Sequence, residues 1–277
     1  AAQRYAQEFR CPKQHRRDTI ALLRMLARTK LTFVGDSVMR QFPQAVLCHL
    51  QEHATSDDIE WIQWGGGEQC FRAPGSQPLR HCYMFGNGCV RFKHDVEVCY
   101  ARQHRCGAQT IIDVLSNFTR ESVMSAHNVV VFAYGHYGCT SNSWQQLSEK
   151  ATALLQVKAW LRNVTVFFQD FTPSHFNSLE GTGEFNKTRA QLYRDCEANL
   201  TSSPPEKNIE NAVVLPLLKT LGWKLLATYG IDVHAGRFHA SHSVTSSNID
   251  CRHWILPGEP DLWAKVLYGA LLRLKGL

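Results

Sequence analysis

The sequence predicts an α/β fold, a three-layer sandwich with a mostly parallel central sheet, cross-linked by disulfides. The runs Val129–Tyr134 and Val164–Phe168 are rich in β-branched and aromatic residues, as expected of strands buried on both faces of a parallel sheet. Segments with apolar residues at helical spacing alternate with such runs along the chain. No repeat, low-complexity tract or linker divides the sequence, so we expect a single domain over residues 1–277.

The N-terminal elements alternate between helix and strand. Apolar spacing predicts a helix at 19–28, begun by a capping Asp18 or Thr19. The apolar run 31–34 predicts a strand, and the spacing from 38 to 47 predicts a helix that ends near residue 49. A polar connector then precedes a predicted strand at 59–64.

Residues from about 65 to 110 form a cysteine-rich irregular insert in this prediction. Short apolar runs alternate there with Gly, Pro and five cysteines, which favours a β-rich segment with a hairpin across 83–85 and 90–98. The turn of that hairpin is expected at Gly86-Asn87-Gly88. Gly65–Gly67 is interpreted as a flexible turn, and its alternative role is to place a backbone N–H in an oxyanion hole.

The C-terminal half is predicted to be helix-rich. The last helix opens at Pro260 or Asp261 and runs to Leu274, with proline in its favoured first position. The other elements expected here are helices at 143–160, 188–200 and 209–221, the last containing Pro216, and a strand at 223–229.

Composition narrows the class of protein. The net charge of +6 over 277 residues is spread thinly, and no basic block or aromatic-interleaved basic motif points to nucleic acid. The ten cysteines are scattered and lack paired CxxC motifs, which argues against structural zinc and favours disulfides formed in an oxidising compartment. Their connectivity cannot be derived from the spacing.

Four N-x-[ST] sequons agree with such a compartment. No apolar run reaches the roughly eighteen residues that a membrane span needs, and no signal peptide opens the chain. We therefore expect a soluble domain in the secretory-pathway lumen (Golgi) or outside the cell, with any targeting segment or membrane anchor outside these residues. The candidate glycosylation sites are Asn117, Asn163, Asn186 and Asn199.

Ser37 and the pair Asp250/His253 are the candidate catalytic residues. Ser37 lies in a Gly-Asp-Ser turn between a strand and a helix, so its hydroxyl would stand at the carboxyl edge of the sheet. An aspartate three residues before a histidine lets one loop supply both the imidazole and the carboxylate that orients it. Alone, each pattern also fits a capped turn or a surface loop. Together they predict that His253 takes the Ser37 proton and that Ser37 carries an acyl group.

Three further histidines, at 234, 239 and 242, are close enough in sequence to suggest a metal site. No carboxylate or thiol at ligand spacing completes such a site, and the chain has thirteen histidines in all. We therefore expect no metal.

Four blocks of the sequence match one family pattern. Gly35 to Arg40 matches a G-D-S-x-x-R block, Gly135-His136 a strand that ends in Gly-His, and Thr172–Phe176 an S-P-x-H-F-like segment. Asp250–Trp263 matches the long signature D-C-x-H-W-C-L-P-G-x-P-D-x-W. In these blocks the chain resembles the SGNH (GDSL) hydrolase superfamily, and more narrowly its PC-esterase branch. That branch includes plant trichome-birefringence-like proteins, many of them polysaccharide O-acetyltransferases.

This resemblance implies an SGNH-hydrolase-like fold and a triad of Ser37, Asp250 and His253 that passes through an acyl-enzyme. It implies an oxyanion hole made by the Ser37 backbone N–H and groups near Gly135 and His136. The asparagine that donates a hydrogen bond after this strand in many SGNH enzymes is missing. His136 either replaces it as a donor or shapes the loop.

Other matched positions have less definite implied roles. Arg40 either binds substrate or pairs with Asp36, of which the structural pair is preferred. His234 falls where the family has a similar Asp-x-His, which implies a supporting role in the site. Gly35 and Asp36 are implied to lie at the oxyanion or substrate position beside Ser37. Ile255 stands where the family usually has a cysteine, so one family disulfide is lost or has another partner here.

The resemblance implies a carbohydrate O-acyltransferase, most simply an O-acetyltransferase, that uses an acyl donor as co-substrate and no bound cofactor. An esterase with the same triad and a non-catalytic SGNH-fold glycoprotein, acting as a binding or structural module, are the alternatives. The expected partner is a carbohydrate acceptor or an esterified glycan, and not a nucleic acid.

Overall fold

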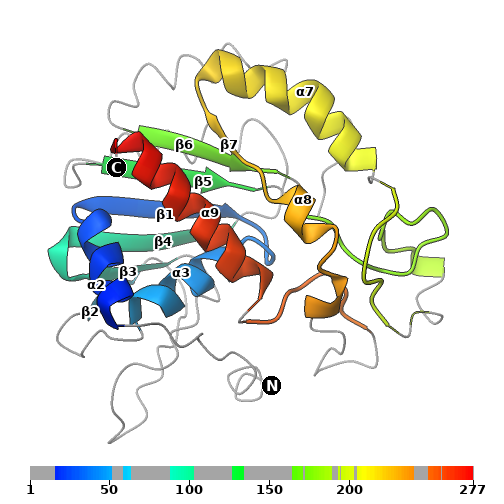
Figure 1. Cartoon of the computed structure of the whole chain (residues 1–277), viewed down its shortest axis with the longest axis horizontal. Coiled ribbons are helices and arrows are strands. Elements are labelled where there is room, and N and C mark those ends of the chain that lie inside the picture. The colour runs from blue at the N-terminus through cyan, green and yellow to red at the C-terminus, as the bar shows by residue number, and fades with distance from the viewer. Residues whose placement is uncertain are drawn as a thin grey trace, which may run out of the picture.

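The computed structural model of the chain describes residues 16–51, 59–63, 88–102, 127–133, 164–170, 172–188, 193, 195–202, 205–239, 249–256 and 258–276. These residues form an α/β fold on one seven-stranded sheet with the order β2-β3-β4-β1-β5-β6-β7 (Figure 1). The five strands from β4 to β7 in that order pair in parallel, whereas β3 is antiparallel to β4 and β2 to β3. The predicted mostly parallel α/β fold is confirmed. The strands are β1 (Thr29–Gly35), β2 (Ile59–Gln63), β3 (Gly88–Phe92), β4 (Val96–Arg102), β5 (His127–Phe132), β6 (Val164–Gln169) and β7 (Lys224–Leu226).

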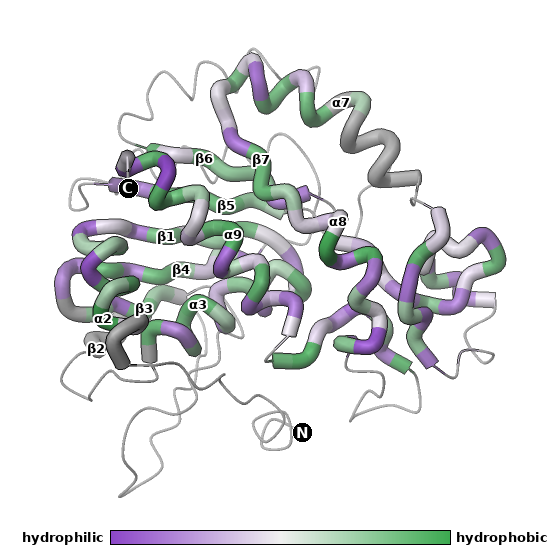
Figure 2. Tube along the Cα trace, in the orientation of Figure 1, coloured by the Kyte–Doolittle hydropathy of each residue, from purple (hydrophilic) through white to green (hydrophobic). Residues whose placement is uncertain are grey.

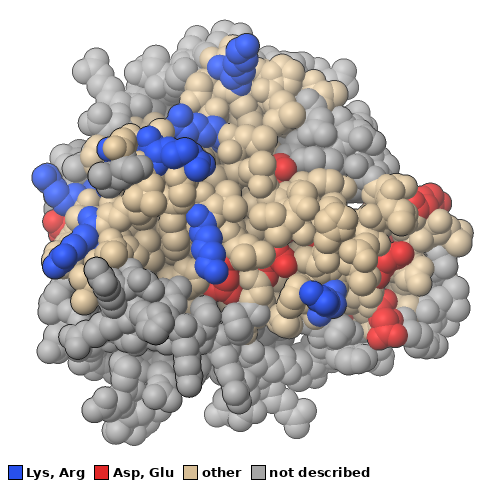
Figure 3. All heavy atoms as spheres, viewed as in Figure 1, with Lys and Arg blue, Asp and Glu red and all other residues tan. Residues whose placement is uncertain are grey.

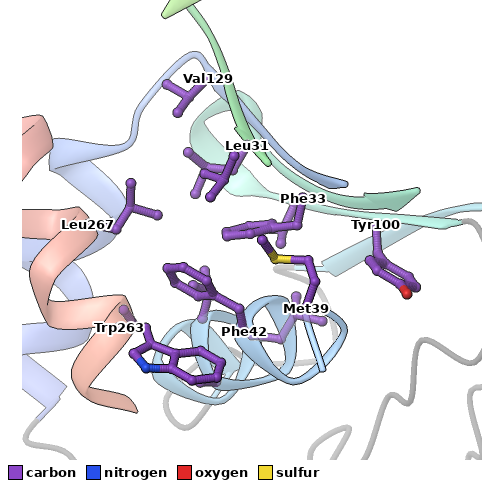
Figure 4. Packing of buried hydrophobic residues seen from close by; sticks show 14 of the residues in the cluster. Leu31, Phe33, Met39, Phe42, Tyr100, Val129, Trp263 and Leu267 are labelled. Carbon is purple, nitrogen blue, oxygen red and sulfur yellow. The ribbon is translucent and has the colours of Figure 1, made fainter. Parts of the chain in front are cut away.

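Three helices cover one face of the sheet. They are α2 (Arg16–Met25), α3 (Gln41–Gln51) and α9 (Glu259–Leu274), and Figure 1 shows α9 crossing in front of the strands. Between the sheet and these helices lies one apolar cluster in which Phe42 contacts both Phe33 and Trp263, with ring centroids 4.8 and 5.8 Å apart (Figure 4). Burial of such large side chains is the main favourable contribution to the fold.

The opposite face of the sheet is also buried. Along β5 and β6 alternate residues belong to the first cluster, while the residues between them, Val130, Phe132, Val166 and Phe168, are buried outside it. Phe132 stacks on Trp223, which follows α7 (Pro205–Leu221). Strands buried on both faces explain why these runs are continuously apolar, and Figure 2 shows the sheet as a largely hydrophobic band.

Strand β1 lies at the point where the chain changes direction across the sheet. The strands that follow it, β2 to β4, are added on one side, and β5 starts the other side. In open α/β sheets the carboxyl ends of strands at such a point form the usual ligand crevice. The segment after β1 is therefore where topology alone would place a site.

Several predicted elements differ in the structure. The described hairpin is formed by β3 and β4 with its turn at Lys93–Asp95, which interrupts the strand predicted over 90–98. The predicted partner strand at 83–85 and residues 86 and 87 of the predicted turn lie outside the described residues. The helix predicted at 188–200 is wrong for its second half, because residues 195–200 form no helix, and residues 189–192 and 194 lie outside the described residues. The helix after β1 begins at Gln41, behind a turn at 36–40. The predicted helix 143–160 and the rest of the predicted insert lie outside the described residues.

Disulfides and charge complete the framework. Cys89 pairs with Cys99 across β3 and β4, Cys196 pairs with Cys251, and Cys48 is disulfide-bonded as well. Every cysteine in the described ranges is thus oxidised. No helix within those ranges has the length and apolar character to cross a bilayer. On the face drawn in Figure 3, Lys and Arg stand at separate places rather than in one stripe.

Candidate active site

Residues 35–40, which carry the candidate nucleophile Ser37 and are called the nucleophile turn below, begin at the last residue of β1. Oδ1 of Asp36 accepts the backbone N–H groups of Val38 at 2.9 Å and Met39 at 3.4 Å. The hydroxyl of Tyr100, from the neighbouring strand β4, lies 2.6 Å from the Asp36 carbonyl oxygen and 3.0 Å from that of Gly35. These contacts fix the main chain on both sides of Ser37.

Gly35 is required by close packing. A Cβ at this position would lie 2.6 Å from Cβ of Met39 and 2.7 Å from the carbonyl oxygen of Ala133. Both distances are shorter than real Cβ contacts, so any side chain would push the turn away from the end of β5. The Gly-Asp-Ser sequence therefore has a steric reason for its first residue and a hydrogen-bonding reason for its second.

The base loop, residues 250–254, is organised by one carboxylate. Oδ1 of Asp250 accepts the backbone N–H groups of Arg252 at 3.1 Å and His253 at 3.0 Å, and Oδ2 lies 2.9 Å from Nδ1 of His253. Burial alone would raise the pKa of Asp250, but the hydrogen bonds and charge of His253, with the two amides, outweigh it and lower the pKa to about 2. An ionised Asp250 requires the His253 proton on Nδ1, which leaves a lone pair on Nε2.

The two segments meet at Ser37. Nε2 of His253 lies 2.8 Å from Oγ of Ser37, so the hydroxyl can donate to the imidazole. The side chains of His253 and Asp250 are 22% and 17% exposed. A ligand can therefore reach the pair, although most of its surface is shielded from water. The arrangement has the contacts by which a base removes the proton of an attacking serine.

A buried histidine, His239, contacts the base loop through its ring and one hydrogen bond. His239 stacks on Trp254 with ring centroids 3.8 Å apart, and its Nδ1 lies 3.1 Å from the carbonyl oxygen of His253. Burial lowers the pKa of His239 to about 3, so the ring is neutral and donates from Nδ1. In the sequence this residue stands out only as a candidate metal ligand, because nothing in its local pattern distinguishes a supporting histidine from a loop histidine.

The Thr172–Phe176 block also supports the loop rather than reaching Ser37. The backbone N–H of His175 donates to the Cys251 carbonyl at 2.8 Å. The fully buried ring places its nitrogens 2.7 Å from the Glu197 carbonyl and 2.9 Å from that of Asp232. Asp232 in turn accepts the indole N–H of Trp263 at 2.8 Å, and burial raises its pKa, which favours a neutral carboxyl. Two of the matched sequence blocks are thereby joined through buried polar groups.

Asp36 and Arg40, two further candidates from the sequence, are joined through the backbone and not through their side chains. Burial raises the pKa of Asp36, although the amides of Val38 and Met39 oppose the rise. The preferred Arg40–Asp36 pair is not seen among the side-chain contacts of Asp36. The two residues are joined by the Arg40 backbone N–H, 3.1 Å from the Asp36 carbonyl.

His234 is not brought to the base loop by any contact among the described residues. It is exposed, and its Nδ1 lies 3.2 Å from Oδ1 of Asn199. The sequon asparagines Asn186 and Asn199 are both exposed. The candidates that lie outside the described residues are Gly135, His136, Asn117, Asn163 and the 65–67 loop.

One group of residues has metal-ligand geometry within the described ranges. Cys89, Glu97 and Cys99 are close enough to share an ion. The two cysteines, however, are joined in a disulfide, and Glu97 pairs with Lys30 at 3.2 Å. These side chains are therefore occupied by structural contacts.

Comparison with known proteins identifies the family. Residues 95–270 match the family model described as PC-esterase, a GDSL/SGNH-like acyl-esterase family found in Pmr5 and Cas1p. The chain is 26% identical to trichome birefringence-like protein 6 of Arabidopsis thaliana over 91% of its length and 58% of that protein. It is 25% identical to protein trichome birefringence over 91% and 46%, and 22% identical to trichome birefringence-like protein 40 over 96% and 75%. It thus spans little more than half of the first of these proteins. Because the family model matches most of the sequence, this chain belongs to the PC-esterase family of GDSL/SGNH-like acyl-esterases.

Proposed function

We propose that the protein is a carbohydrate O-acyltransferase, most simply an O-acetyltransferase, that works through an acyl-enzyme on Ser37. The observation that carries the proposal is the continuous hydrogen-bond chain from Ser37 Oγ to His253 Nε2, at 2.8 Å, and from His253 Nδ1 to Asp250, at 2.9 Å. Membership of an acyl-esterase family supplies the reaction class. The proposal that the acyl group is acetyl and that the acceptor is a carbohydrate rests on the resemblance of the sequence motifs.

In the first half-reaction Ser37 attacks the carbonyl carbon of an acyl donor. The Oγ–H proton moves to His253 Nε2 as the bond from Oγ to the acyl carbon forms. The ionised Asp250 stabilises the resulting imidazolium through Nδ1. As the intermediate collapses, the bond from the acyl carbon to the leaving oxygen breaks, and that oxygen takes the proton from His253.

The negative charge on the carbonyl oxygen needs hydrogen-bond donors. The Ser37 backbone N–H supports this role, because it has no acceptor in the described part of the chain while the next two amides are held by Asp36. A hydrogen bond to this amide would cost no existing contact. A second donor near Gly135 and His136 remains a prediction.

In the second half-reaction an acceptor hydroxyl replaces the donor. His253 takes the hydroxyl proton, the acceptor oxygen attacks the acyl carbon, and the Ser37 oxygen leaves with that proton. If water takes the place of the sugar, the same steps give an esterase. Esterase activity is the second candidate because the matched family is described as acyl-esterases. The two activities differ only in what reaches the acyl-enzyme. The third possibility, an inactive binding module, would retain the hydrogen bonds but form no acyl-enzyme.

The proposed place of action is the secretory-pathway lumen or the cell exterior. Disulfides such as Cys196–Cys251 form and persist in an oxidising compartment, and they support this assignment. Exposure of Asn186 and Asn199 is compatible with glycans at these sequons.

The test is incubation with an activated acetyl ester, with and without candidate oligosaccharides, followed by mass spectrometry of the intact protein and of the Ser37 peptide. Transfer predicts an acetyl adduct on Ser37 that moves to sugar when an acceptor is added, whereas hydrolysis predicts fast release to water. The matched control is Ser37→Ala, which keeps the fold and removes the nucleophile. Equal labelling of both proteins, or none of either, would rule out the acyl-enzyme.

A further inference from the structure

Gln41 joins the nucleophile helix to the base loop by two hydrogen bonds. It is the first residue of α3 and is 3% exposed. Its side-chain Oε1 accepts the backbone N–H of Trp254 at 3.0 Å, and its Nε2 donates to the Trp254 carbonyl oxygen at 2.5 Å. One amide side chain thus satisfies both polar groups of one residue, as a neighbouring strand would.

The two ends of this contact lie next to the candidate catalytic groups. Gln41 comes four residues after Ser37, and Trp254 directly follows His253. The two hydrogen bonds of Gln41 therefore connect the same two segments as the Ser37–His253 hydrogen bond. Planar amide groups that bond at two points fix orientation as well as distance.

Other contacts hold the base loop without reaching the nucleophile turn. Asp250 binds the amides of its own loop, and His239 binds the His253 carbonyl. They fix the internal shape of the loop. Gln41, in contrast, sets the position of that loop relative to Ser37, because it belongs to the helix that continues the turn.

We infer that Gln41 is a positioning residue that holds His253 Nε2 within hydrogen-bond distance of Ser37 Oγ. This inference rests on the proposed function in so far as it concerns acylation. We call the two hydrogen bonds between Gln41 and Trp254 the clamp. Its loss would leave the buried N–H and C=O of Trp254 without partners, so the loop would shift to find others. A shift of about 1 Å is enough to lower a proton-transfer-dependent rate by roughly 100-fold.

The main test compares Gln41→Leu with Gln44→Leu. Leucine has about the volume of glutamine but no hydrogen-bonding group, and Gln44 is a buried glutamine on the same helix with no hydrogen bond to the base loop among the described residues. With a small activated acetyl ester, Gln41→Leu should lower the rate constant for Ser37 acylation by roughly 10- to 100-fold at unchanged KM. Gln44→Leu should stay within about two-fold of the parent protein. An equal loss in both variants would mean a general effect on the helix and would overturn the inference.

A second variant distinguishes positioning from a merely structural role. Gln41→Glu has the shape of glutamine, but its ionised carboxylate can accept from Trp254 N–H and cannot donate to Trp254 O. On protonation it regains a donor and both hydrogen bonds. The acylation rate of Gln41→Glu, divided by that of the parent protein at the same pH, should therefore rise as the pH falls from 8 to 5. The same ratio for Gln41→Leu should stay constant, and a flat ratio for both variants would contradict the clamp.

Hydrogen exchange separates this inference from the proposed function. The Trp254 amide, measured in a peptide over 250–256, should exchange at least ten-fold faster in Gln41→Leu than in the parent or in Gln44→Leu. If the parent protein forms no Ser37 adduct but the exchange changes as expected, the proposed function fails and the clamp stands. If the exchange of Trp254 is unchanged, the clamp fails whatever the labelling shows.

Discussion

Oδ2 of Asp250 lies 2.9 Å from the ring Nδ1 of His253, while Oδ1 of the same carboxylate accepts the His253 backbone N–H at 3.0 Å. One aspartate thus fixes both the main chain and the ring of one histidine, three residues further along the loop. With the spacing Asp-x-x-His, both groups of His253 lie within hydrogen-bond distance of the one carboxylate. The candidate base, His253, is therefore oriented by its own loop, and other contacts bring it to Ser37.

Replacing Asp250 by asparagine should keep the loop and lose the reaction. The asparagine oxygen can still accept the two backbone amides, but its NH₂ group would face Nδ1 and force the ring proton to Nε2, where it blocks the lone pair needed by Ser37. We expect Ser37 acylation by an activated ester to fall roughly 10³- to 10⁴-fold. Acylation is measured by mass spectrometry, and circular dichroism checks the fold. An acylation rate close to that of the parent protein would show that Asp250 does not set the tautomer.

Tyr100 should matter both to stability and to the nucleophile turn. Tyr100→Phe removes the hydroxyl that lies against the carbonyls of Gly35 and Asp36, which costs about 1–2 kcal/mol in the free energy of unfolding. Because these carbonyls belong to the two residues directly before Ser37, acylation should also slow, by roughly ten-fold.

The matched control for this variant is Tyr193→Phe. Its hydroxyl accepts the backbone N–H of Asn186 at 2.9 Å, and phenylalanine keeps the ring that packs in one cluster with Phe176 and Cys251. It should lose a similar amount of stability, measured by denaturant unfolding, and none of its acylation rate. If Tyr100→Phe alone left both quantities unchanged, the hydroxyl would have no role in the turn.

The long apolar strands were the most predictable part of the fold. Strands β5 and β6 are buried on both faces, so their sequences contain a short, almost unbroken apolar run rich in β-branched and aromatic residues, which favours a strand. The turn between β3 and β4 was not predictable, because His94 and Asp95 adopt positive φ angles of 68° and 56° without a glycine to indicate it. The segment 195–200 resembles a helix locally, but a disulfide from Cys196 to Cys251 and backbone bonds to distant residues determine its path.

The candidate site was predictable to a similar, limited degree. The Gly-Asp-Ser turn and the Asp-x-x-His loop each have a local pattern, so their residues could be named. Gln41 and Tyr100 could not be named, because their contacts join residues 213 and 64 positions apart and leave no local pattern. Residues that act only through tertiary contacts can be recognised only in the folded structure.

His239 should make stability depend on pH in the acidic range. Its pKa is about 3 in the folded protein and near 6.5 in an unfolded chain, because burial disfavours the charged ring. Between pH 6.5 and pH 3 the unfolded chain therefore binds a proton at His239 that the folded protein does not bind. The stability that neutral His239 contributes is present above pH 6.5 and is lost as the pH falls toward 3. The slope from this group is at most about 1.4 kcal/mol per pH unit.

The measurement is the free energy of unfolding of the parent protein and of His239→Gln at pH 7 and pH 4. Glutamine does not titrate and can still donate to the His253 carbonyl, so the difference in stability between parent and variant should shift in favour of the variant at pH 4. A His239→Phe variant, which keeps a ring against Trp254, should show the same change with pH. A difference that stays constant from pH 7 to pH 4 would mean that His239 is not the group that titrates.

The disulfide between Cys196 and Cys251 should support both stability and the base loop. It closes a loop of 55 residues, and the chain-entropy relation gives about 4 kcal/mol for its loss, against about 3 kcal/mol for the bond between Cys89 and Cys99, which are ten residues apart. Cys251 lies inside the base loop, whereas Cys89 lies in β3 and Cys99 in the neighbouring strand β4.

Paired serine substitutions test the two disulfides separately. Removing Cys196–Cys251 should lower the midpoint of thermal unfolding and also slow Ser37 acylation at temperatures where the protein is still folded, because Asp250 and Arg252 flank the released residue. Removing Cys89–Cys99 should destabilise the sheet and leave the acylation rate of the folded fraction within about two-fold, since neither cysteine contacts the base loop in the described structure. Equal effects of the two double variants on acylation would show that the Cys196–Cys251 bond stabilises the fold as a whole and has no specific effect on the position of His253.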